Sequence, residues 1–321
     1  MPSFSVVVPV FNSRQYLEGL VAALARLTEP SGGFEVIFVD NRSDDGGVEY
    51  LASACEADPR MRVLPGPGIG PAAARNVGVA AATGVYIAFT DPDTLPEPDW
   101  LVAAAAALEQ HGARALEGAV LPEGAAPRPM MRPVRNEDGG RYMTANMIYA
   151  RALLEEVGGF DERFRPPPFL EDSDIAFRVM DAGAEIPFEP SVRVRHRDVP
   201  ATPRSELASQ ARLQWMALVA SKHPERYLRQ LRPKVQTFRP GDVALLVAVP
   251  AAAAARRLGT GARVLSLGWL AVAVRRVVRA SGAAEAPGEE RASWIAAALA
   301  GPAVRAFHLV SGWLRFGHWP G

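Results

Sequence analysis

The sequence is short of cysteine, lysine and unbalanced charge. Cys55 is the only cysteine among 321 residues, which excludes a disulfide framework and a cysteine-based zinc site. Lysine occurs twice and the formal net charge is zero, so nucleic acid is not an expected partner. No basic segment followed by an apolar core precedes the first strand-like run, so no signal peptide is expected. These absences favour a reducing, cytoplasmic setting.

Two common nucleotide-binding signatures are also missing. The glycine-rich segment GPGIGPAAARNVG (66–78) follows the third apolar run, whereas a dinucleotide-binding fingerprint follows the first strand. No loop ends in the Gly-Lys-Ser/Thr of a phosphate-binding P-loop. The segment instead leads into a helix that carries Arg75 early, and both arginine and helix N-termini suit phosphate groups. The alternative is a surface arginine on an alanine-rich helix.

Short apolar runs alternate with segments of helical periodicity over the first half of the chain. Strands are expected at Ser5–Val10, Phe34–Val39, Met61–Leu64, Val85–Phe89 and Ser191–His196, and helices at Tyr16–Leu27, Val48–Ala57, Ala72–Ala82, Trp100–Gln110 and Glu171–Ala182. Thr144–Val157 fits either a helix or a strand. The alternation predicts a doubly wound, Rossmann-like α/β fold, with a mostly parallel sheet and helices on both faces.

Three of the expected strands end in segments that carry polar residues, at 9–12, 40–46 and 91–93. Each group alone could be a turn, because Asp, Asn, Ser and Gly are turn formers. Three in succession at the carboxyl edge of one sheet indicate a shared ligand pocket instead. Asp91 and Asp93 offer the carboxylate oxygens that Mg²⁺ or Mn²⁺ prefers.

Six segments, taken in this order, resemble the family 2 glycosyltransferases, which have the GT-A fold. They are VVVPVFN (6–12), VDNRSDDG (39–46), GIGPAAARNVG (68–78), FTDPDTLPEPDWL (89–101), VGGFDERF (157–164) and LEDSDIAFRVMDAG (170–183). The resemblance covers about residues 4–200. It implies an inverting, metal-assisted transfer of a sugar from a nucleotide sugar to a hydroxyl group.

The resemblance also implies roles for the nucleotide-binding residues. Pro9, Phe11 and Asn12 would line the base pocket. Asp40 would accept a hydrogen bond from a pyrimidine ring, which favours a UDP-sugar and leaves a dTDP-sugar open. Arg75 would lie near the nucleotide and its diphosphate.

The same resemblance implies a metal site. Asp91-Pro-Asp93 matches the family's DXD motif, with Asp91 near the ribose or the metal and Asp93 as the main metal ligand. His196 falls where many members have a histidine near the diphosphate and metal. The alternative for His196 is a strand-end histidine packed against its neighbours.

Glu171-Asp172 matches the family's Glu-Asp motif, whose aspartate is the general base. Asp172 is therefore the predicted catalytic residue, with Glu171 beside it in the substrate site. Glu171 and Asp174 are the alternative bases, and Asp172 could also cap its helix.

The remaining segments are predicted to surround the sugar and the acceptor. The segment 157–164 would shape the acceptor side, and Thr144 and Asn146 would border the acceptor or the donor sugar. Asn146 could instead bond a loop backbone. Residues 122–142, rich in Pro, Gly and charge, are expected to form a loop or flap that closes over the donor.

The composition changes near the end of the chain, where residues 241–321 contain nine arginines and four acidic residues. We predict a catalytic domain at 1–215 and a C-terminal helical region at 216–321. The apolar runs 243–255, 264–274 and 292–304 are each shorter than the roughly 20 residues of a membrane span.

Arginines at 256, 257 and 263 interrupt the first two runs, and three more follow at 275, 276 and 279. With Trp269, Trp294 and Trp313, this pattern predicts peripheral contact with an anionic membrane. The alternatives are packed helices, a dimer contact or a true span. The predicted acceptor is then a glycan or a lipid-linked intermediate at the cytoplasmic face of the membrane. A transferase acting on a small molecule and a non-catalytic sugar-nucleotide-binding scaffold are the other readings.

Overall fold

The structure is a computed structural model that describes residues 3–124, 131–132, 134–233, 240–254, 260–281, 288 and 290–317. The chain divides into two compact units. Unit 1 comprises Met1–Ala126 and Pro133–Asp198, and unit 2 comprises Pro127–Arg132 and Val199–Gly321. The domain limits expected from the sequence, 1–215 and 216–321, stay a prediction.

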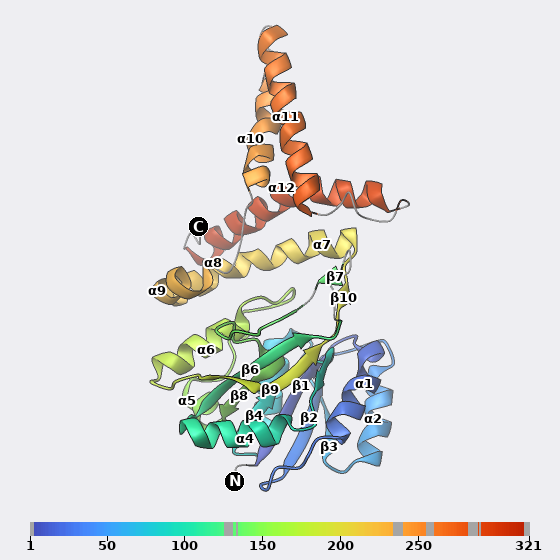
Figure 1. The fold of residues 1–321 in the computed structure, drawn as a ribbon, viewed down its shortest axis with the longest axis vertical. Coiled ribbons are helices and arrows are strands. Elements are labelled where there is room, and N and C mark those ends of the chain that lie inside the picture. The colour runs from blue at the N-terminus through green and yellow to red at the C-terminus, as the bar shows by residue number, and fades with distance from the viewer. Residues whose placement is uncertain are drawn as a thin grey trace. The chain divides into compact units, whose positions relative to one another are not determined.

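Unit 1 is built from alternating strands and helices, coloured from blue through green to yellow in Figure 1. In chain order its elements are β1 (Phe4–Val10), α1 (Arg14–Ala25), β2 (Phe34–Asp40), α2 (Gly47–Ala57), β3 (Met61–Pro65), α3 (Pro71–Ala81), β4 (Tyr86–Phe89), β5 (Thr94–Pro96), α4 (Trp100–His111), β6 (Ala115–Pro122), η1 (Thr144–Asn146), β8 (Met147–Ala150), α5 (Arg151–Glu156), α6 (Glu171–Asp181) and β9 (Phe188–His196). The expected elements of the first half of the chain are confirmed.

The strands of unit 1 form one eight-stranded sheet in the order β3-β2-β1-β4-β8-β6-β9-β5. The first four strands in that order run parallel to one another. Strand β8 is antiparallel to both β4 and β6, β9 is parallel to β6, and β5 is antiparallel to β9. The predicted α/β architecture is therefore confirmed, with a mixed sheet.

Both faces of this sheet are buried under helices. In β1, Val6 and Val8 belong to the core that α1 and α4 cover, with Leu20 of α1 and Trp100 of α4 in the same cluster. Val7, which points to the opposite face, packs in a second core with residues of α3, α5 and α6. The burial of β1 on both sides explains its uninterrupted apolar sequence.

Two segments are ambiguous or unassigned from the sequence alone, and a third, β9, is predicted. Residues 144–156 form a short 3₁₀ turn, a strand and a helix in succession. Strand β6 was not anticipated, because Glu117 and Gly118 interrupt its apolar pattern. In β9 the expected alternation is confirmed, since Val192 and Val194 are buried while the arginines between and after them are exposed.

Unit 2 is mainly helical within the part of the chain that is described. Its elements are β7 (Met131–Arg132), β10 (Val199–Pro200), α7 (Pro203–Ser209), η2 (Gln210–Leu213), α8 (Gln214–Lys222), α9 (Pro224–Arg226), η3 (Tyr227–Leu231), α10 (Pro240–Ala254), α11 (Thr260–Ser281) and α12 (Arg291–Phe316). Strands β7 and β10 pair antiparallel. The predicted C-terminal helical region is confirmed.

The sequence-based statement that no run is long enough to span a membrane needs correction. Helix α12 has 26 residues, and it is the one helix among the described residues that is long and apolar enough to cross a bilayer. The apolar run 292–304 ends before Arg305, whereas the helix continues past that residue to Phe316. The predicted interruptions at Arg256 and Arg257 lie outside the described residues.

Helix α12 nevertheless has packing partners inside unit 2. Gly312 lies against the backbone of Gln214 in α8, so closely that a side chain would collide there. The rings of Trp215 and Phe316 are 5.9 Å apart. Leu309 of α12 is also buried, as expected of a helix in a folded core.

Candidate functional site

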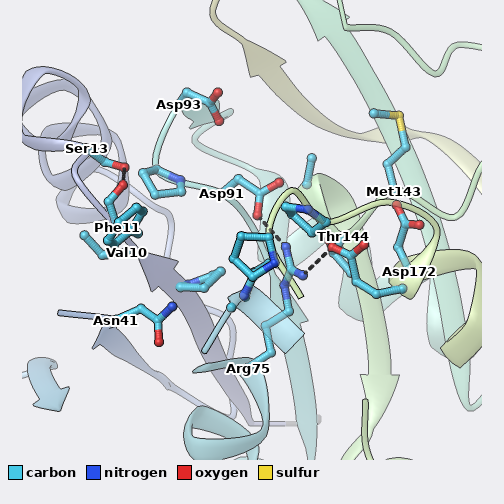
Figure 2. Close-up of a pocket in the computed structure, with 18 of the residues that line it drawn as sticks. Val10, Phe11, Ser13, Asn41, Arg75, Asp91, Asp93, Met143, Thr144 and Asp172 are labelled. Atoms are coloured by element: carbon cyan, nitrogen blue, oxygen red, sulfur yellow. Dashed lines mark hydrogen bonds and ion pairs between the residues drawn. The ribbon is translucent and has the colours of Figure 1, made fainter. Parts of the chain in front are cut away.

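A cavity of about 410 Å³ lies in unit 1 beyond the carboxyl ends of β1 and β4. This volume falls in the range of small-molecule sites, roughly 300–1,000 Å³. The cavity is lined by Pro9, Val10, Phe11, Ser13, Tyr16, Asn41, Gly70, Pro71, Arg75, Asp91, Pro92, Asp93, Met143, Thr144, Ala145, Pro166, Pro168, Glu171, Asp172 and His196. In Figure 2, Val10, Phe11, Ser13 and Asn41 lie on one side, Met143, Thr144 and Asp172 on the other, and Asp91 and Arg75 between them.

Most of the residues singled out in the sequence meet in this cavity. They come from parts of the chain that are far apart: the carboxyl ends of β1 and β9, helix α3, the loop after β4, the short turn η1 and the first turn of α6. These residues are Pro9, Phe11, Arg75, Asp91, Asp93, Thr144, Glu171, Asp172 and His196. The shared pocket expected at the strand ends is thus present.

Arg75 is the buried cation of the site. One guanidinium nitrogen lies 2.9 Å from Asp91 Oδ1 and the other 3.3 Å from Glu171 Oε1, and Figure 2 marks both contacts with dashed lines. Burial by itself would lower the pKa of Arg75, but the carboxylates of Asp91 and Glu171 outweigh it and raise that pKa. The guanidinium therefore stays charged and ties the Asp91 loop to the start of α6.

The local sequence explains how Arg75 reaches this position. Helix α3 begins at Pro71, after Gly70 with a φ of 133°. The Arg75 guanidinium lies 5.6 Å from the centre of the Phe160 ring. The amide of Asn76 donates to the Phe160 carbonyl and accepts from the Phe160 N–H, which fixes that ring under Arg75.

Asp93 and His196 face each other across the mouth of the same cavity. His196 Nε2 lies 3.5 Å from Asp93 Oδ1, and Nδ1 lies 2.9 Å from the Arg197 carbonyl. If Nδ1–H donates to that carbonyl, Nε2 of the neutral ring presents a lone pair to the carboxylate. Burial raises the pKa of Asp93, and the charge of Asp91 raises it further, against the opposing effect of His196. Nε2 of His196 and Oδ1 of Asp93 would then be two acceptors that face each other, an arrangement that a proton or a cation between them stabilises.

These residues fit a divalent cation whose coordination shell is completed by other oxygen ligands. No group of three or more His, Cys, Asp or Glu side chains converges within the described ranges. Mg²⁺ and Mn²⁺ sites commonly use one or two carboxylates, with waters and substrate phosphates as the remaining ligands. Asp93 and His196 supply such a partial set beside Asp91.

Asp172 occupies the opposite end of the cavity, in the first turn of α6. Its Oδ1 accepts a 2.7 Å hydrogen bond from the N–H of Ser173, and it forms no ion pair with a described basic residue. Burial raises the pKa of Asp172 to about 8, and the neighbouring Glu171 carboxylate adds to the shift, while Ser173 and Arg75 oppose it. A carboxyl group with such a pKa is suited to take a proton near neutral pH. The alternative that Asp172 caps the helix is not supported, because the N-cap residue is Leu170 and no side chain caps it.

Two predicted base-binding residues lie next to the cavity without lining it. The backbone N–H of Asn12 donates to Ser43, and its side-chain oxygen accepts from the N–H of Asp44. The Asp40 carboxylate accepts from the N–H groups of Arg42 and Ser43. Both side chains thus build the turns that follow β1 and β2, and their contacts with a nucleotide stay predictions.

The structure corrects the predicted position of Asn146. This side chain is fully buried outside the cavity wall. Its oxygen accepts from Trp100 Nε1 at 2.8 Å, and its nitrogen donates to the carbonyls of Ala119 and Val192. All its hydrogen-bonding groups are used within the core, by Trp100 and by strand carbonyls of β6 and β9, and not by a loop backbone as the alternative proposed.

The segment predicted to shape the acceptor side, residues 157–164, also contributes nothing to the cavity wall. Of the predicted flap, residues 125–130 and 133 lie outside the described residues. The described wall residues next to it are Met143, Thr144 and Ala145.

Several wall residues were not anticipated, among them Ser13, Tyr16, Asn41, Met143, Pro166 and Pro168. Asn41 directly follows Asp40, and its oxygen accepts a 2.7 Å hydrogen bond from the N–H of Gly68. Its position in the strand-end motif was a usable signal. The proline run at 166–168 carries no such signal in the sequence. Its position in the cavity wall depends on how the loop before α6 folds back.

Comparison with known proteins finds similar sequences and similar folds. A sequence profile described as "Glycosyl transferase family 2" matches residues 5–165, half of the chain. Glycosyltransferase AglE of Haloferax volcanii is 28% identical over 222 residues, which span 64% of this chain and 70% of that protein. The pre-mycofactocin glycosyltransferase of Mycobacterium tuberculosis is 31% identical over 219 residues, which span 60% of this chain and only 42% of that protein.

Solved structures agree on the fold. The mannosyltransferase PcManGT of Pyrobaculum calidifontis, in complex with GDP-Man and Mn²⁺, has a TM-score of 0.60 at 23% identity and covers 94% of this chain and 87% of its own. Residues 1–349 of S. aureus TarS in complex with UDP-GlcNAc have a TM-score of 0.53 at 18% identity, covering 98% of this chain and 92% of their own.

Proposed function

This chain belongs to glycosyl transferase family 2, and from that premise we propose that it transfers a sugar, with inversion, from a nucleoside diphosphate sugar to an acceptor hydroxyl. The observation that supports this mechanism most directly is the composition of one cavity. In Figure 2, Asp172 lies on one side of Asp91 and Asp93 on the other, and His196 lies 3.5 Å from Asp93. The reaction needs a proton acceptor and a site for a diphosphate leaving group, and these two sides offer them.

In the proposed reaction Asp172 accepts the proton of the acceptor hydroxyl. The hydroxyl oxygen then attacks the anomeric carbon from the side opposite the diphosphate. A new carbon–oxygen bond forms as the bond to the diphosphate breaks, so the configuration at that carbon inverts. The raised pKa of Asp172 makes it a stronger base than an exposed aspartate, once it is ionised.

At the other end of the cavity, Asp93 and His196 would hold Mn²⁺ or Mg²⁺ together with Asp91. A bound divalent cation neutralises charge that develops on the leaving diphosphate. Asp91 has a second task, because its Oδ1 already accepts from Arg75. Arg75 is then a brace between Asp91 and Glu171 that also places positive charge beside the diphosphate.

The proposed donor is a UDP-sugar or a dTDP-sugar, because Asp40 would accept a hydrogen bond from the N–H of a pyrimidine ring. One similar structure carries UDP-GlcNAc and another GDP-Man, so a guanine nucleotide belongs in the same test. The wall residues Pro9 and Phe11 supply the apolar surface for a base, and Phe11 is 58% exposed.

The test is a donor screen that measures release of UDP, dTDP or GDP from a panel of nucleotide sugars, with Mn²⁺ and with a chelator. We expect slow release from one nucleotide class with Mn²⁺, because water replaces the missing acceptor, and loss of that release with chelator. Release that is unaffected by a chelator would contradict the proposed metal role. Binding without turnover of any sugar, even with added acceptors, would favour a non-catalytic sugar-nucleotide-binding scaffold.

We further propose that the helices of unit 2 contact an anionic membrane, which would suit a lipid-linked or membrane-borne glycan acceptor. Helix α11 exposes Val264, Leu265 and Leu267 by 60–77%, and Trp269 by 41%. Its arginines at 275, 276 and 279 are exposed as well. Apolar side chains with a following cluster of arginines are typical of helices that lie in a lipid headgroup layer. Trp294 does not share this role, because it is only 5% exposed.

Flotation with vesicles of phosphatidylglycerol or of phosphatidylcholine tests this contact. We expect binding to the anionic vesicles only, and weaker binding for Leu265→Ser. A matched control is Val85→Ser, since Val85 is 56% exposed but belongs to unit 1. Equal flotation of both variants and the wild type, or none at all, would instead favour an acceptor in solution, such as a small molecule.

A further inference from the structure

Glu117 is a buried carboxylate that neither the sequence motifs nor the proposed chemistry uses. It lies within β6, inside the sheet of unit 1, and is 1% exposed. No basic side chain in the described part of the chain forms an ion pair with it. A charged group buried in this way is costly unless hydrogen bonds compensate it.

That compensation comes entirely from one loop. Glu117 Oε1 accepts from Asn136 Nδ2 at 2.8 Å, from the N–H of Arg141 at 2.9 Å and from the N–H of Tyr142 at 2.5 Å. Oε2 accepts from the N–H of Gly140 at 2.6 Å. Three consecutive backbone N–H groups thus converge on one side chain, as they do around a bound anion.

The loop that surrounds Glu117 continues directly into the cavity wall. Residues 143–145 follow the last of these donors and line the cavity opposite Phe11 and Ser13. Two further contacts fix the same stretch. Val120 and Asn136 form an isolated β-bridge, and Thr90 Oγ1 donates to the Ala145 carbonyl at 2.9 Å.

The backbone between these anchors follows a path that few sequences allow. Gly139, Gly140 and Tyr142 have φ values of 75°, 72° and 55°. A side chain at Gly139 would also collide with the ring of Phe188. Left-handed residues on both sides of Arg141 turn the N–H groups inward, toward Glu117.

We propose that Glu117 is a positioning residue that holds residues 134–146 in place and thereby fixes residues 143–145 as a permanent wall of the cavity. This differs from the flap expected from the sequence, at least for the part of that segment that the structure describes. Opening the wall would remove four hydrogen bonds from a carboxylate in the sheet interior, so the loop stays in place with or without a donor. The consequence for sugar transfer rests on the proposed function, whereas the fixed wall does not.

Limited digestion with trypsin tests the wall without measuring activity. Arg135 and Arg141 are exposed cleavage sites within the segment that Glu117 holds, but their backbone must leave its anchors to enter a protease. We expect slow cleavage at both sites in the wild type, equally slow with UDP and Mn²⁺. In Glu117→Gln, whose amide nitrogen would oppose an N–H donor, cleavage should be about tenfold faster.

Glu35→Gln is the matched control. Glu35 also accepts four hydrogen bonds within the same sheet, from Ser5 Oγ, from Thr83 N and Oγ1, and from Arg62. It lies at the amino end of β2, away from the cavity. This control should lose comparable stability without faster cleavage at Arg135 or Arg141. If Glu117→Gln does not fold, Asn136→Ala removes one of the four donors and should give a smaller increase.

Transfer measurements complete the test. We expect Glu117→Gln to bind UDP with Mn²⁺ as the wild type does and to lose about tenfold in kcat/KM, because the wall borders the sugar rather than the base. Rapid cleavage of the wild type that UDP and Mn²⁺ suppress would show a closing flap and overturn the proposal. So would a Glu117→Gln protein that is cleaved like the wild type, or one that opens without any change in transfer. A wild type that turns over no donor would contradict the proposed function alone.

Discussion

The two ends of the cavity treat their carboxylates differently. Asp91 has a guanidinium partner at 2.9 Å and Asp93 faces an imidazole at 3.5 Å, whereas Asp172 accepts from the N–H of Ser173 at 2.7 Å and from its hydroxyl at 3.5 Å. Burial raises the pKa of both Asp93 and Asp172, and the electrostatic effect of His196 opposes that rise at Asp93. The end with Asp93 and His196 is therefore suited to bind a cation, and the end with Asp172 to exchange a proton. Each prediction below tests this division.

The largest effect is expected at the end that exchanges a proton. Asp172→Asn removes the proton acceptor and should lower kcat by about 10²–10⁴-fold, while binding of UDP with Mn²⁺ is retained. Asp174→Asn is the control, because Asp174 lies in the same helix turn but pairs with Arg178 at 2.9 Å. It should lower Tm more than activity. A large loss of kcat in Asp174→Asn, with little loss in Asp172→Asn, would identify Asp174 as the base instead.

Asp93→Asn tests the end that is suited to bind a cation. Loss of the main metal ligand should weaken Mn²⁺-dependent binding of UDP by about 10–100-fold, with little change in the absence of metal. Isothermal titration with and without Mn²⁺ measures this difference. Asp99→Asn, an exposed aspartate before α4 in the same stretch, should behave like the wild type. Equal binding by both variants would remove Asp93 from the metal site.

The pH dependence of kcat/KM in the wild type tests the ionisation of Asp172. Asp172 must lose its proton to act as a base, so kcat/KM should rise with pH and level off above its pKa of about 8. At pH 7 only about a tenth of the groups are ionised, which predicts a roughly tenfold lower kcat/KM than on the plateau. An acid limb near pH 4 instead would mean that Asp172 is not the group that limits the reaction.

The smallest effect concerns the arginine that joins the ends. The positive charge of Arg75 lowers the pKa of Asp172, so Arg75→Gln should raise it and move the acid limb to higher pH, by up to about one unit. Arg75→Lys keeps the charge but cannot bridge Asp91 and Glu171, so it should lower kcat/KM with a smaller shift. If both variants leave the acid limb where it is in the wild type, the two ends are electrostatically independent.

Much of unit 1 could be predicted because its signals are local. Apolar runs such as 34–39 and polar residues at their ends gave both the sheet and the edge where the cavity lies. Strand β6 was missed because Glu117 looks like a surface residue, and the loop that buries it comes some twenty residues later in the chain. Hydrogen bonds between residues so far apart in the chain produce no periodic pattern in the sequence.

One error within the site, at Asn146, and two assignments that stay predictions, at Asn12 and Asp40, have one physical origin. Asn12, Asp40 and Asn146 carry side chains that can bind either a ligand or a backbone, and the residue type does not distinguish the two. In the structure all three bond backbone groups, and Asn146 also binds Trp100. Arg75, Asp91 and Asp172 were placed in the cavity correctly, but the ion pairs around Arg75 depend on folding and could not be anticipated.

The route of the chain between the two units has a consequence for protein synthesis. Strand β7 belongs to unit 2, yet it interrupts unit 1, and its partner β10 follows only after β9. On the ribosome, β7 therefore emerges well before the strand it pairs with, so this small sheet forms late. A chain cut after Asp198 would keep β7 without its partner. The helical region and the catalytic sheet are therefore not separable at a single point in the gene.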